Sequence, residues 1–227
     1  MTTLIAEDVL LLLLDDETGR LESTHYDPLL GGAVLLELAM SGNLEVRKAG
    51  AWSSAKVQVL TDGRRPESDV LRDGLHTVQE KERTAQDLVN RIGKGLKDRL
   101  LAGLVERGVV RLDEDKVLGL FPRKRWPAVD SGHEDEGRRE ISAALINGVT
   151  PDEHTAALIA LLHSVDRAHR TVDNQGTPGR QVKARAKEIS EGEWAAKAVK
   201  EAVAAAQAAM TAVMVATTAA GAAGAGS

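Results

Sequence analysis

Hydrophobic residues recur every three or four positions along most of the chain, which is the period of an amphipathic helix. Segments with this period are residues 29–41, 68–80, 84–108, 138–147, 150–172 and 180–190, and an alanine-rich stretch follows over residues 194–218. Residues 4–14 are apolar almost throughout and predict a buried helix, with a central strand as the alternative. Only residues 44–60 and 109–121 alternate at a period of two, which predicts β-hairpins. We therefore expect a mainly α protein, with a central helix bundle and peripheral β-hairpins.

The first part of the stretch from Thr84 to Phe121 predicts one long amphipathic helix, which ends at Gly108. Its apolar stripe consists of Leu88, Ile92, Leu96, Leu100 and Leu104. Gly93 and Gly95 lie within the helix and mark a kink or a close crossing with another helix. A basic ridge runs beside the stripe and consists of Arg91, Lys94 and Lys97.

The second part of this stretch predicts a projecting hairpin over residues 109–121, whose polar turn is Asp113, Glu114 and Asp115. The returning strand carries four large apolar residues: Val117, Leu118, Leu120 and Phe121. A lone hairpin is marginal in water, and adjacent residues of a regular strand point to opposite faces. We therefore expect a second copy of the chain to cover this strand, which makes the protein a homo-oligomer through the 109–121 hairpin.

The densest basic segment of the chain comes directly after this hairpin and consists of Arg123, Lys124, Arg125 and Trp126. Basic residues beside a Trp are typical of contact with anionic headgroups at a membrane interface. The alternative is a solvated loop with its Trp packed on the domain. Because this segment and the basic ridge flank the same hairpin in the sequence, we favour the membrane interpretation.

Composition and charge narrow the class of protein. The 227 residues include 43% hydrophobic, 28% charged and only 2% aromatic residues, so the core is aliphatic. A net charge of −5 argues against a generic nucleic-acid binder, which is usually basic. The chain has no cysteine and no convincing signal peptide or membrane span, which indicates a cytoplasmic protein. Short connections predict one domain over residues 1–218, followed by a frayed Gly/Ala tail over residues 219–227.

Local signals give two further expectations. Thr150, Pro151 and Glu153 have the spacing of a capping box, which predicts Thr150 as the N-cap of the helix that follows. On that helix, His163, Asp166 and His169 have a spacing that can ligate a metal, but no other His or Glu group points to the same place. No catalytic motif is present, so we expect no enzyme activity, no metal and no cofactor.

Three blocks of the sequence resemble the Golgi phosphoprotein family: residues 4–12 (LIAEDVLLL), 30–38 (LGGAVLLEL) and 100–110 (LLAGLVERGVV). The resemblance extends over residues 4–172 and more loosely to residue 210. The few aromatic residues and the alanine-rich end are similar to the bacterial, notably actinobacterial, branch. The resemblance implies a mainly helical single domain with hairpins at its edge, the second of which lies at the membrane face and mediates self-association.

Eukaryotic members of that family are peripheral Golgi proteins that bind phosphatidylinositol 4-phosphate and act as adaptors for client membrane proteins. Their headgroup pocket uses a Trp and three Arg residues. The resemblance assigns these positions to Glu22, Gly31, Lys94 and Lys97, so two are lost and two are lysine. Lysine lacks the bidentate fork of arginine for phosphate, which leaves general affinity for anionic lipid as the expectation.

The sequence therefore leads to two functional hypotheses. The first is a cytoplasmic peripheral membrane protein that binds anionic, phosphoinositide-like headgroups and acts as an adaptor for a client protein. Its headgroup residues are Arg91, Lys94, Lys97, Arg123, Lys124, Arg125 and Trp126. The alternative is a winged-helix regulator that binds nucleic acid, with the hairpin as its wing. The acidic pI of about 5.7 weighs against the alternative.

Overall fold

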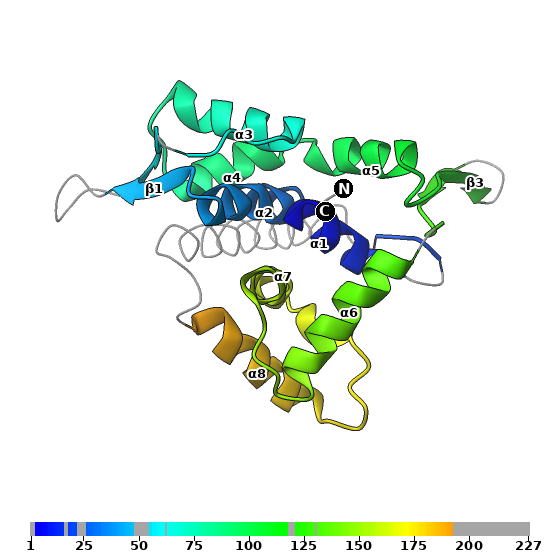
Figure 1. Ribbon diagram of the computed structural model, residues 1–227. Helices are drawn as coiled ribbons and strands as arrows, with labels where there is room; N and C mark the ends of the chain where they lie inside the picture. Colours follow the sequence, from blue (N-terminus) through cyan, green and yellow to red (C-terminus); the bar gives the residue numbers. More distant parts are fainter. Residues whose placement is uncertain are drawn as a thin grey trace, which may run out of the picture. The chain divides into compact units, whose positions relative to one another are not determined.

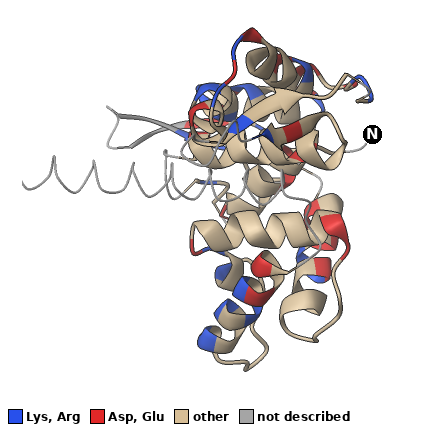
Figure 2. Ribbon diagram, turned by 90° about the vertical axis from the view of Figure 1, so that its left-hand side faces the viewer, with Lys and Arg blue, Asp and Glu red and all other residues tan. Residues whose placement is uncertain are grey.

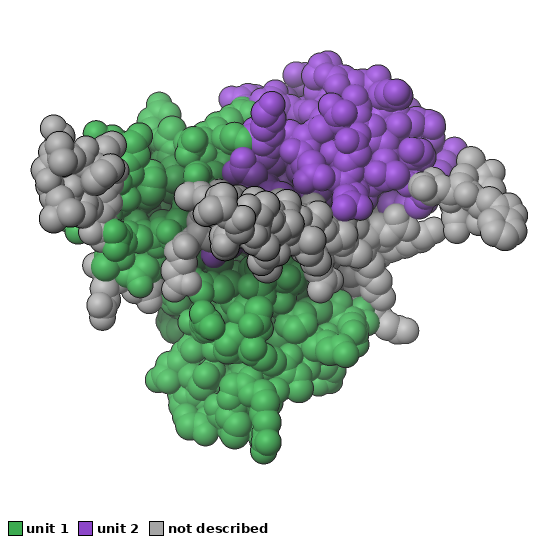
Figure 3. Space-filling view, turned by 180° about the vertical axis from the view of Figure 1, so that it is seen from behind, with its two compact units in different colours: residues 1–24, 95–192 green, residues 25–94, 193–227 purple. Residues whose placement is uncertain are grey.

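A computed structural model describes residues 3–15, 18–21, 26–47, 55–61, 63–117, 121–129 and 131–192 (Figure 1). The described chain is mainly helical with two small antiparallel strand pairs, which confirms the expected fold class. Contacts within the chain divide it into two compact units, unit 1 from residues 1–24 and 95–192 and unit 2 from residues 25–94 and 193–227 (Figure 3). The predicted last helix and tail lie outside the described residues, and the expected domain boundaries stay a prediction.

Unit 2 is built around α2 (Asp27–Met40), which packs against α3 (Asp69–Glu80) and α4 (Ala85–Gly93). Eleven of the fourteen α2 residues are buried. Its hairpin pairs β1 (Leu44–Arg47) with β2 (Lys56–Val59), in the segment that the alternating pattern predicts. The helix ends follow local sequence signals, since Ser68 caps α3 and Thr84 caps α4 with a side-chain hydrogen bond.

Two glycines allow α2 and α4 to cross in close contact. A Cβ atom at Gly31 of α2 would lie 2.1 Å from the Val89 carbonyl oxygen of α4. One at Gly93 would lie 1.9 Å from the Asp27 carbonyl oxygen of α2. Both distances are far shorter than any real contact, so only glycine fits at this crossing. The close helix crossing expected at Gly93 is therefore confirmed.

Unit 1 has a core of two buried helices. All nine residues of α1 (Ile5–Leu13) are buried, and α7 (Glu153–Ser164) buries eight residues in a row. These helices pack against each other and against α6 (Gly132–Leu145), while α8 (Gly179–Glu191) covers α7. The expected helix over residues 4–14 is thus confirmed, and the strand alternative is wrong. Among the described residues, every helix is too short or too polar to cross a membrane.

The single long helix expected between Thr84 and Gly108 is wrong. It is two helices, α4 ending at Gly93 and α5 (Leu96–Glu106) beginning after Gly95. Gly95 has a φ of +71°, a left-handed conformation that interrupts the helical hydrogen bonds. The apolar stripe continues through the break because Leu88, Leu96 and Leu100 are all buried. A period of 3.6 residues therefore did not distinguish one helix from two.

The second hairpin of the chain has a different register from the expected one. It pairs β3 (Asp113–Val117) with β4 (Phe121–Arg125), so the acidic residues 113–115 form a strand and not the turn. The register places Asp113 opposite Arg125, Glu114 opposite Lys124 and Asp115 opposite Arg123. Opposite charges across the two strands favour this pairing. Leu118 and Leu120 lie outside the described residues, and only the backbone of Val117 and Phe121 is described.

Three other helix ends differ from the sequence expectations. Helix α6 begins at Gly132, before residue 138, where the helical pattern of the sequence begins. The N-cap of α7 is Asp152, whose side chain accepts a hydrogen bond from the Thr155 amide at 2.8 Å, so the Thr150 capping box is wrong. Helix α7 ends at Ser164, and the 3₁₀ turn η1 (Ala168–Arg170) follows Asp166, which has a φ of +56°. The expected helix up to residue 172 is therefore interrupted.

Candidate membrane-binding site

The predicted headgroup residues are divided between the two units. Arg91 and Lys94 belong to unit 2, whereas Lys97 and residues 123–126 belong to unit 1. Basic and acidic residues are interspersed over the described helices (Figure 2), and the chain carries a net charge of −5. A local excess of positive charge therefore depends on which basic side chains lack an acidic neighbour.

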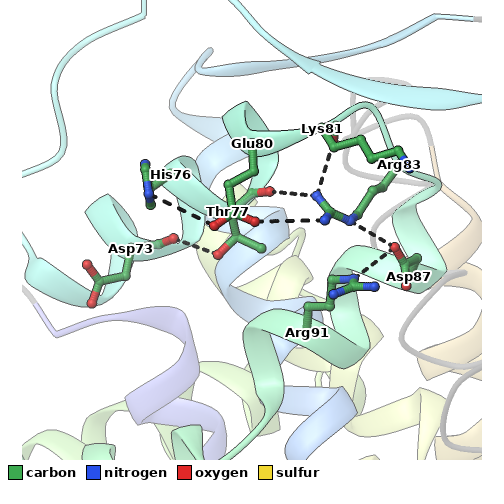
Figure 4. A network of polar contacts seen from close by, with 8 residues as sticks. All are labelled: Asp73, His76, Thr77, Glu80, Lys81, Arg83, Asp87 and Arg91. Carbon is green, nitrogen blue, oxygen red and sulfur yellow. Dashed lines mark hydrogen bonds and ion pairs between the residues drawn. The ribbon is translucent and has the colours of Figure 1, made fainter.

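Arg91 belongs to a polar network that joins α3 to α4 (Figure 4). Its Nε atom lies 3.0 Å from the Asp87 carboxylate, which also accepts from Arg83 at 3.1 Å. Arg83 in turn donates to the Thr77 and Lys81 carbonyl oxygens at the end of α3. Arg91 thus shares the Asp87 carboxylate, one helical turn away, with Arg83, which offsets part of its positive charge.

Lys94 and Lys97 lie on either side of the helix break. Lys94 is the C-cap residue of α4 and its side chain is exposed. Lys97 lies in the first turn of α5, where its side chain is 18% exposed and its Nζ is 3.7 Å from the Asp98 carboxylate. Of this pair, Lys94 is the more accessible to an anionic surface.

The basic segment after the second hairpin is part of β4 and the residues that follow it. Lys124 is 59% exposed and lies 3.5 Å from Glu114 on the neighbouring strand, while Arg125 is half-buried. Arg123 is described by its backbone alone, opposite Asp115. The acidic strand β3 therefore offsets part of the basic charge of β4, a relation that the expected register did not contain.

Trp126 is fixed in place by the turn that follows α1. Its amide donates to the Gly19 carbonyl oxygen at 2.7 Å. Gly19 has a φ of +63°, and a Cβ atom there would lie 2.3 Å from the Pro127 nitrogen. Only glycine therefore permits this contact between the turn and the residues that follow β4. The half-buried Trp126 lines a cavity of about 170 Å³ together with Leu14, Val110, Ala128 and Arg138.

Exposed apolar residues surround the base of this hairpin. Only three large apolar side chains are exposed in the described part of the chain, and two of them are Leu112 at 42% and Val129 at 60%. Since Val110 pairs with Ala128 and Asp113 with Arg125, Leu112 lies opposite Trp126. Side chains alternate along a strand, so Leu112, Lys124 and Trp126 share one face with Glu114, which is opposite Lys124. We refer to Leu112, Lys124 and Trp126 as the hairpin face.

The structure also contains a cluster that the sequence pattern did not reveal. The buried Asp8 carboxylate of α1 has His133 Nε2 of α6 at 2.8 Å and His154 Nε2 of α7 at 2.9 Å. The cluster borders a cavity of about 150 Å³. Asp8 alone carried a signal, because it is an acidic residue inside an otherwise apolar helix. The cluster ties three helices of unit 1 together, which gives it a structural role.

The spacing of His163, Asp166 and His169 does not produce a metal site in the described residues. Asp166 instead forms an ion pair with Lys183 of α8 at 2.8 Å. The Lys183 hydrogen bond is the main cause of a lowered Asp166 pKa, and burial lowers the pKa of both histidines. Asp166 therefore fastens α8 to the segment between α7 and η1.

Comparison with known families agrees with the sequence blocks quoted above. The model of the family described as Golgi phosphoprotein 3 (GPP34) matches residues 5–206, which is most of the chain. No curated protein matches the sequence.

Proposed function

Because the chain belongs to the Golgi phosphoprotein 3 family, we propose that it is a peripheral membrane protein that binds anionic lipid headgroups. The observation that carries this proposal is the hairpin face, where exposed Leu112, the basic Lys124 and Trp126 come together. Apolar, aromatic and basic side chains in one patch suit the boundary between acyl chains and anionic headgroups. Lys94 of unit 2 is exposed as well.

The lipid selectivity follows from the residues at the family's pocket positions. Gly31, which stands where the resemblance assigns an arginine, is pressed against the Val89 carbonyl oxygen, so no side chain fits there. Lys94 and Lys97 supply point charges without the planar fork that holds a phosphate in two hydrogen bonds. We therefore propose that surface charge, more than one phosphoinositide, determines binding. Glu22 lies outside the described residues.

We propose that the protein acts on the cytoplasmic side of a membrane and that a client membrane protein is its second ligand. We also propose that the 109–121 hairpin mediates self-association. Val129, which is exposed beside the hairpin and does not belong to the hairpin face, supports an apolar contact there.

The proposal is tested by co-sedimentation with phosphatidylcholine vesicles that contain or lack phosphatidylglycerol. Replacing Lys94, Lys97, Arg123, Lys124 and Arg125 by Ala should reduce sedimentation with the anionic vesicles at low salt. Each basic residue near such a surface contributes about 1 kcal/mol, so the combined loss is large. High salt should bring the parent close to the variant, because screening removes the same attraction.

A matched control tests whether the positions of these five basic residues matter, or only the loss of five positive charges. Replacing Arg64, Arg65, Arg139, Arg180 and Lys187, which are exposed residues elsewhere, changes the net charge equally. This control should sediment like the parent, and circular dichroism should show that both variants are folded. Equal loss in both variants, or none in either, would contradict the proposal. A gel shift with duplex DNA tests the winged-helix alternative. Binding of the parent to DNA, without binding to the vesicles, would support that alternative.

A further inference from the structure

A cavity of about 150 Å³ in unit 1 is lined by residues of α1, α6 and α7, beside the cluster that Asp8 forms with His133 and His154. We refer to these three residues as the Asp8 cluster and to the space as the Asp8 cavity. Its apolar floor consists of the buried residues Leu11, Leu12 and Leu158. None of the lining residues belongs to the hairpin face or to the predicted headgroup residues, so the cavity is separate from the proposed membrane contact.

Helix α6 forms the polar rim of the cavity. Its residues in the lining include His133, Glu136, Gly137 and Glu140, which have the i, i+3, i+4, i+7 spacing of one helix face. The buried residues of the same helix lie elsewhere, at Ile141, Ala144 and Leu145. Because His133, Glu136 and Glu140 are exposed, the rim reaches solvent while the floor is buried. The cavity therefore combines an entrance with an apolar end.

Gly137 helps to keep this space open. It lies inside α6, and a Cβ atom added there would meet no atom within 4 Å. Glycine is the least favourable residue of a helix interior after proline. Neither a close contact nor a left-handed conformation requires it at this position. Since Gly137 lines the cavity, a larger side chain there would take up its space.

The Asp8 cluster fixes the polar groups between the floor and the rim. Each oxygen of the buried Asp8 carboxylate meets one imidazole, His133 Nε2 at 2.8 Å and His154 Nε2 at 2.9 Å. These contacts hold two rings from different helices in place. This wall is therefore organised before any ligand arrives, and little freedom is lost on binding.

The other polar groups of the lining favour a cation. Apart from the histidines, the ionisable side chains of the described lining are carboxylates, without a lysine or arginine among them. Glu134 accepts from Arg138, so its charge is already offset. Glu140, however, accepts from the neutral Thr155 hydroxyl at 3.3 Å, and Glu136 lies one helical turn away. Both carboxylates lie beyond the first turn of α6, outside the reach of its dipole, and like charges with this spacing repel each other.

We propose that the Asp8 cavity binds a small primary amine that carries a benzene-sized apolar group. An apolar cavity of about 150 Å³ holds one benzene molecule, so a single ring fits against the three leucines. The ammonium group then lies at the rim and donates to Glu136 and Glu140. The volume is below the roughly 300–1,000 Å³ typical of sites for larger ligands, which restricts the ligand to about one ring.

Ligand-observed NMR with benzylamine tests the role of charge. Benzyl alcohol and benzoate are the comparison ligands, because they carry the same ring with a neutral or a negative group. The parent should bind benzylamine about tenfold or more tightly than benzyl alcohol, since hydrogen bonds between charged groups are about twice as strong as neutral ones. Benzoate should bind more weakly than either.

A pair of charge variants assigns this preference to the rim. Glu136→Gln/Glu140→Gln should bind benzylamine no more tightly than benzyl alcohol, and its affinity for benzyl alcohol should equal that of the parent. Glu67→Gln/Glu106→Gln is the matched control, because it removes two exposed glutamates outside the cavity. The control should keep the parent's preference for benzylamine.

A pair of glycine variants tests the role of shape. Gly137→Leu fills the cavity without changing any charge, and it replaces glycine by a better helix former. It should lose binding of both benzylamine and benzyl alcohol. Gly103→Leu, at a position inside α5 with the same open surroundings, should bind both ligands like the parent. Thermal unfolding shows whether each variant is folded.

Three results would overturn the inference. The first is a parent that does not bind benzylamine at millimolar concentrations. The second is binding of benzyl alcohol or benzoate as tight as that of benzylamine. The third is a folded Gly137→Leu variant that binds like the parent. Gly137→Leu should still sediment with anionic vesicles, so failure of the Asp8 cavity and failure of the proposed membrane binding give different patterns.

Discussion

Gly31 shows how a single residue can combine two constraints. It stands where the resemblance assigns an arginine, and it also forms the crossing of α2 with α4. The second block of the resemblance therefore places a structural glycine where a charged side chain would be expected. The sequence identifies the substitution, and only the structure supplies its cause, because the partner residues Val89 and Gly93 are about sixty positions away.

We predict that Gly31→Ala destabilises the protein by about 1–3 kcal/mol or more, since the added Cβ would overlap the Val89 carbonyl oxygen. Gly103→Ala is the matched control. Gly103 lies inside α5, and a Cβ atom added there would meet no atom within 4 Å, so alanine should stabilise by up to about 1 kcal/mol. Urea denaturation measures both changes. Equal stability of the two variants would show that the crossing is not close-packed.

His163 gives a prediction for the dependence of stability on pH. Its pKa is lowered from 6.5, chiefly by burial. The negative charges of Asp166 and Glu191 raise this pKa, whereas the positive charges of Lys187 and Lys183 lower it further. The unfolded chain therefore takes up a proton near pH 6.5 that the folded chain does not take up until a lower pH. Stability should consequently fall as the pH drops below 6.5. His169, whose pKa burial also lowers, acts in the same direction.

The measurement is the urea midpoint of the parent and of His163→Gln at pH 7.5 and pH 5.5. The variant should lose less stability on acidification than the parent, because it lacks one of the groups that titrate. His76→Gln, which removes an exposed histidine of α3, should behave like the parent. If His163→Gln lost as much stability on acidification as the parent, His163 would not be one of the groups that cause the loss.

At the scale of elements, the sequence predicts which segments are helices better than it predicts where they end. The buried α1 and the hairpin of β1 with β2 follow from composition and period. The break at Gly95 and the register of β3 with β4 do not follow from period. A glycine in a helical pattern is compatible with a kink or a stop, and acidic residues suit a turn as well as a strand beside a basic one.

The start of α7 offers a direct test of one such boundary. Asp152→Ala should destabilise the protein by about 1 kcal/mol, because it removes the side-chain acceptor for the Thr155 amide. Thr150→Ala should be nearly neutral, since Thr150 is exposed and lies outside the helix. Thermal or urea unfolding distinguishes the two, and a larger cost at Thr150 would restore the capping box that the sequence suggests.

The candidate site was predictable only in part. Trp126 and Lys124 follow from the basic–aromatic segment, whereas their shared face with Leu112 depends on the hairpin register. The histidines of the Asp8 cluster have no local signal, because His133 and His154 are 125 and 146 positions away from Asp8 in the sequence. Residues brought together by tertiary packing leave no periodic pattern in the sequence.

At the scale of the whole molecule, we predict that the parent is a homo-oligomer and that the 109–121 hairpin carries the contact. Replacing residues 112–118 by a short Gly-Ser turn should leave a folded monomer, because the helices of unit 1 do not depend on the hairpin for their core. Light scattering coupled to gel filtration measures the mass. A parent that is already monomeric at tens of micromolar would contradict self-association. A deletion variant with the same ratio of measured mass to chain mass as the parent would contradict the role of the hairpin.

The central claim is that the hairpin face contacts an anionic membrane, and Trp126 can report this contact itself. The chain has three Trp residues, so Trp52→Phe/Trp194→Phe leaves Trp126 as the only indole. Brominated acyl chains in phosphatidylglycerol vesicles should then quench its emission, while brominated phosphatidylcholine vesicles should not, and high salt should reverse the quenching. Sedimentation with the anionic vesicles without any quenching of Trp126 would contradict the claim, because the protein would then bind through another surface.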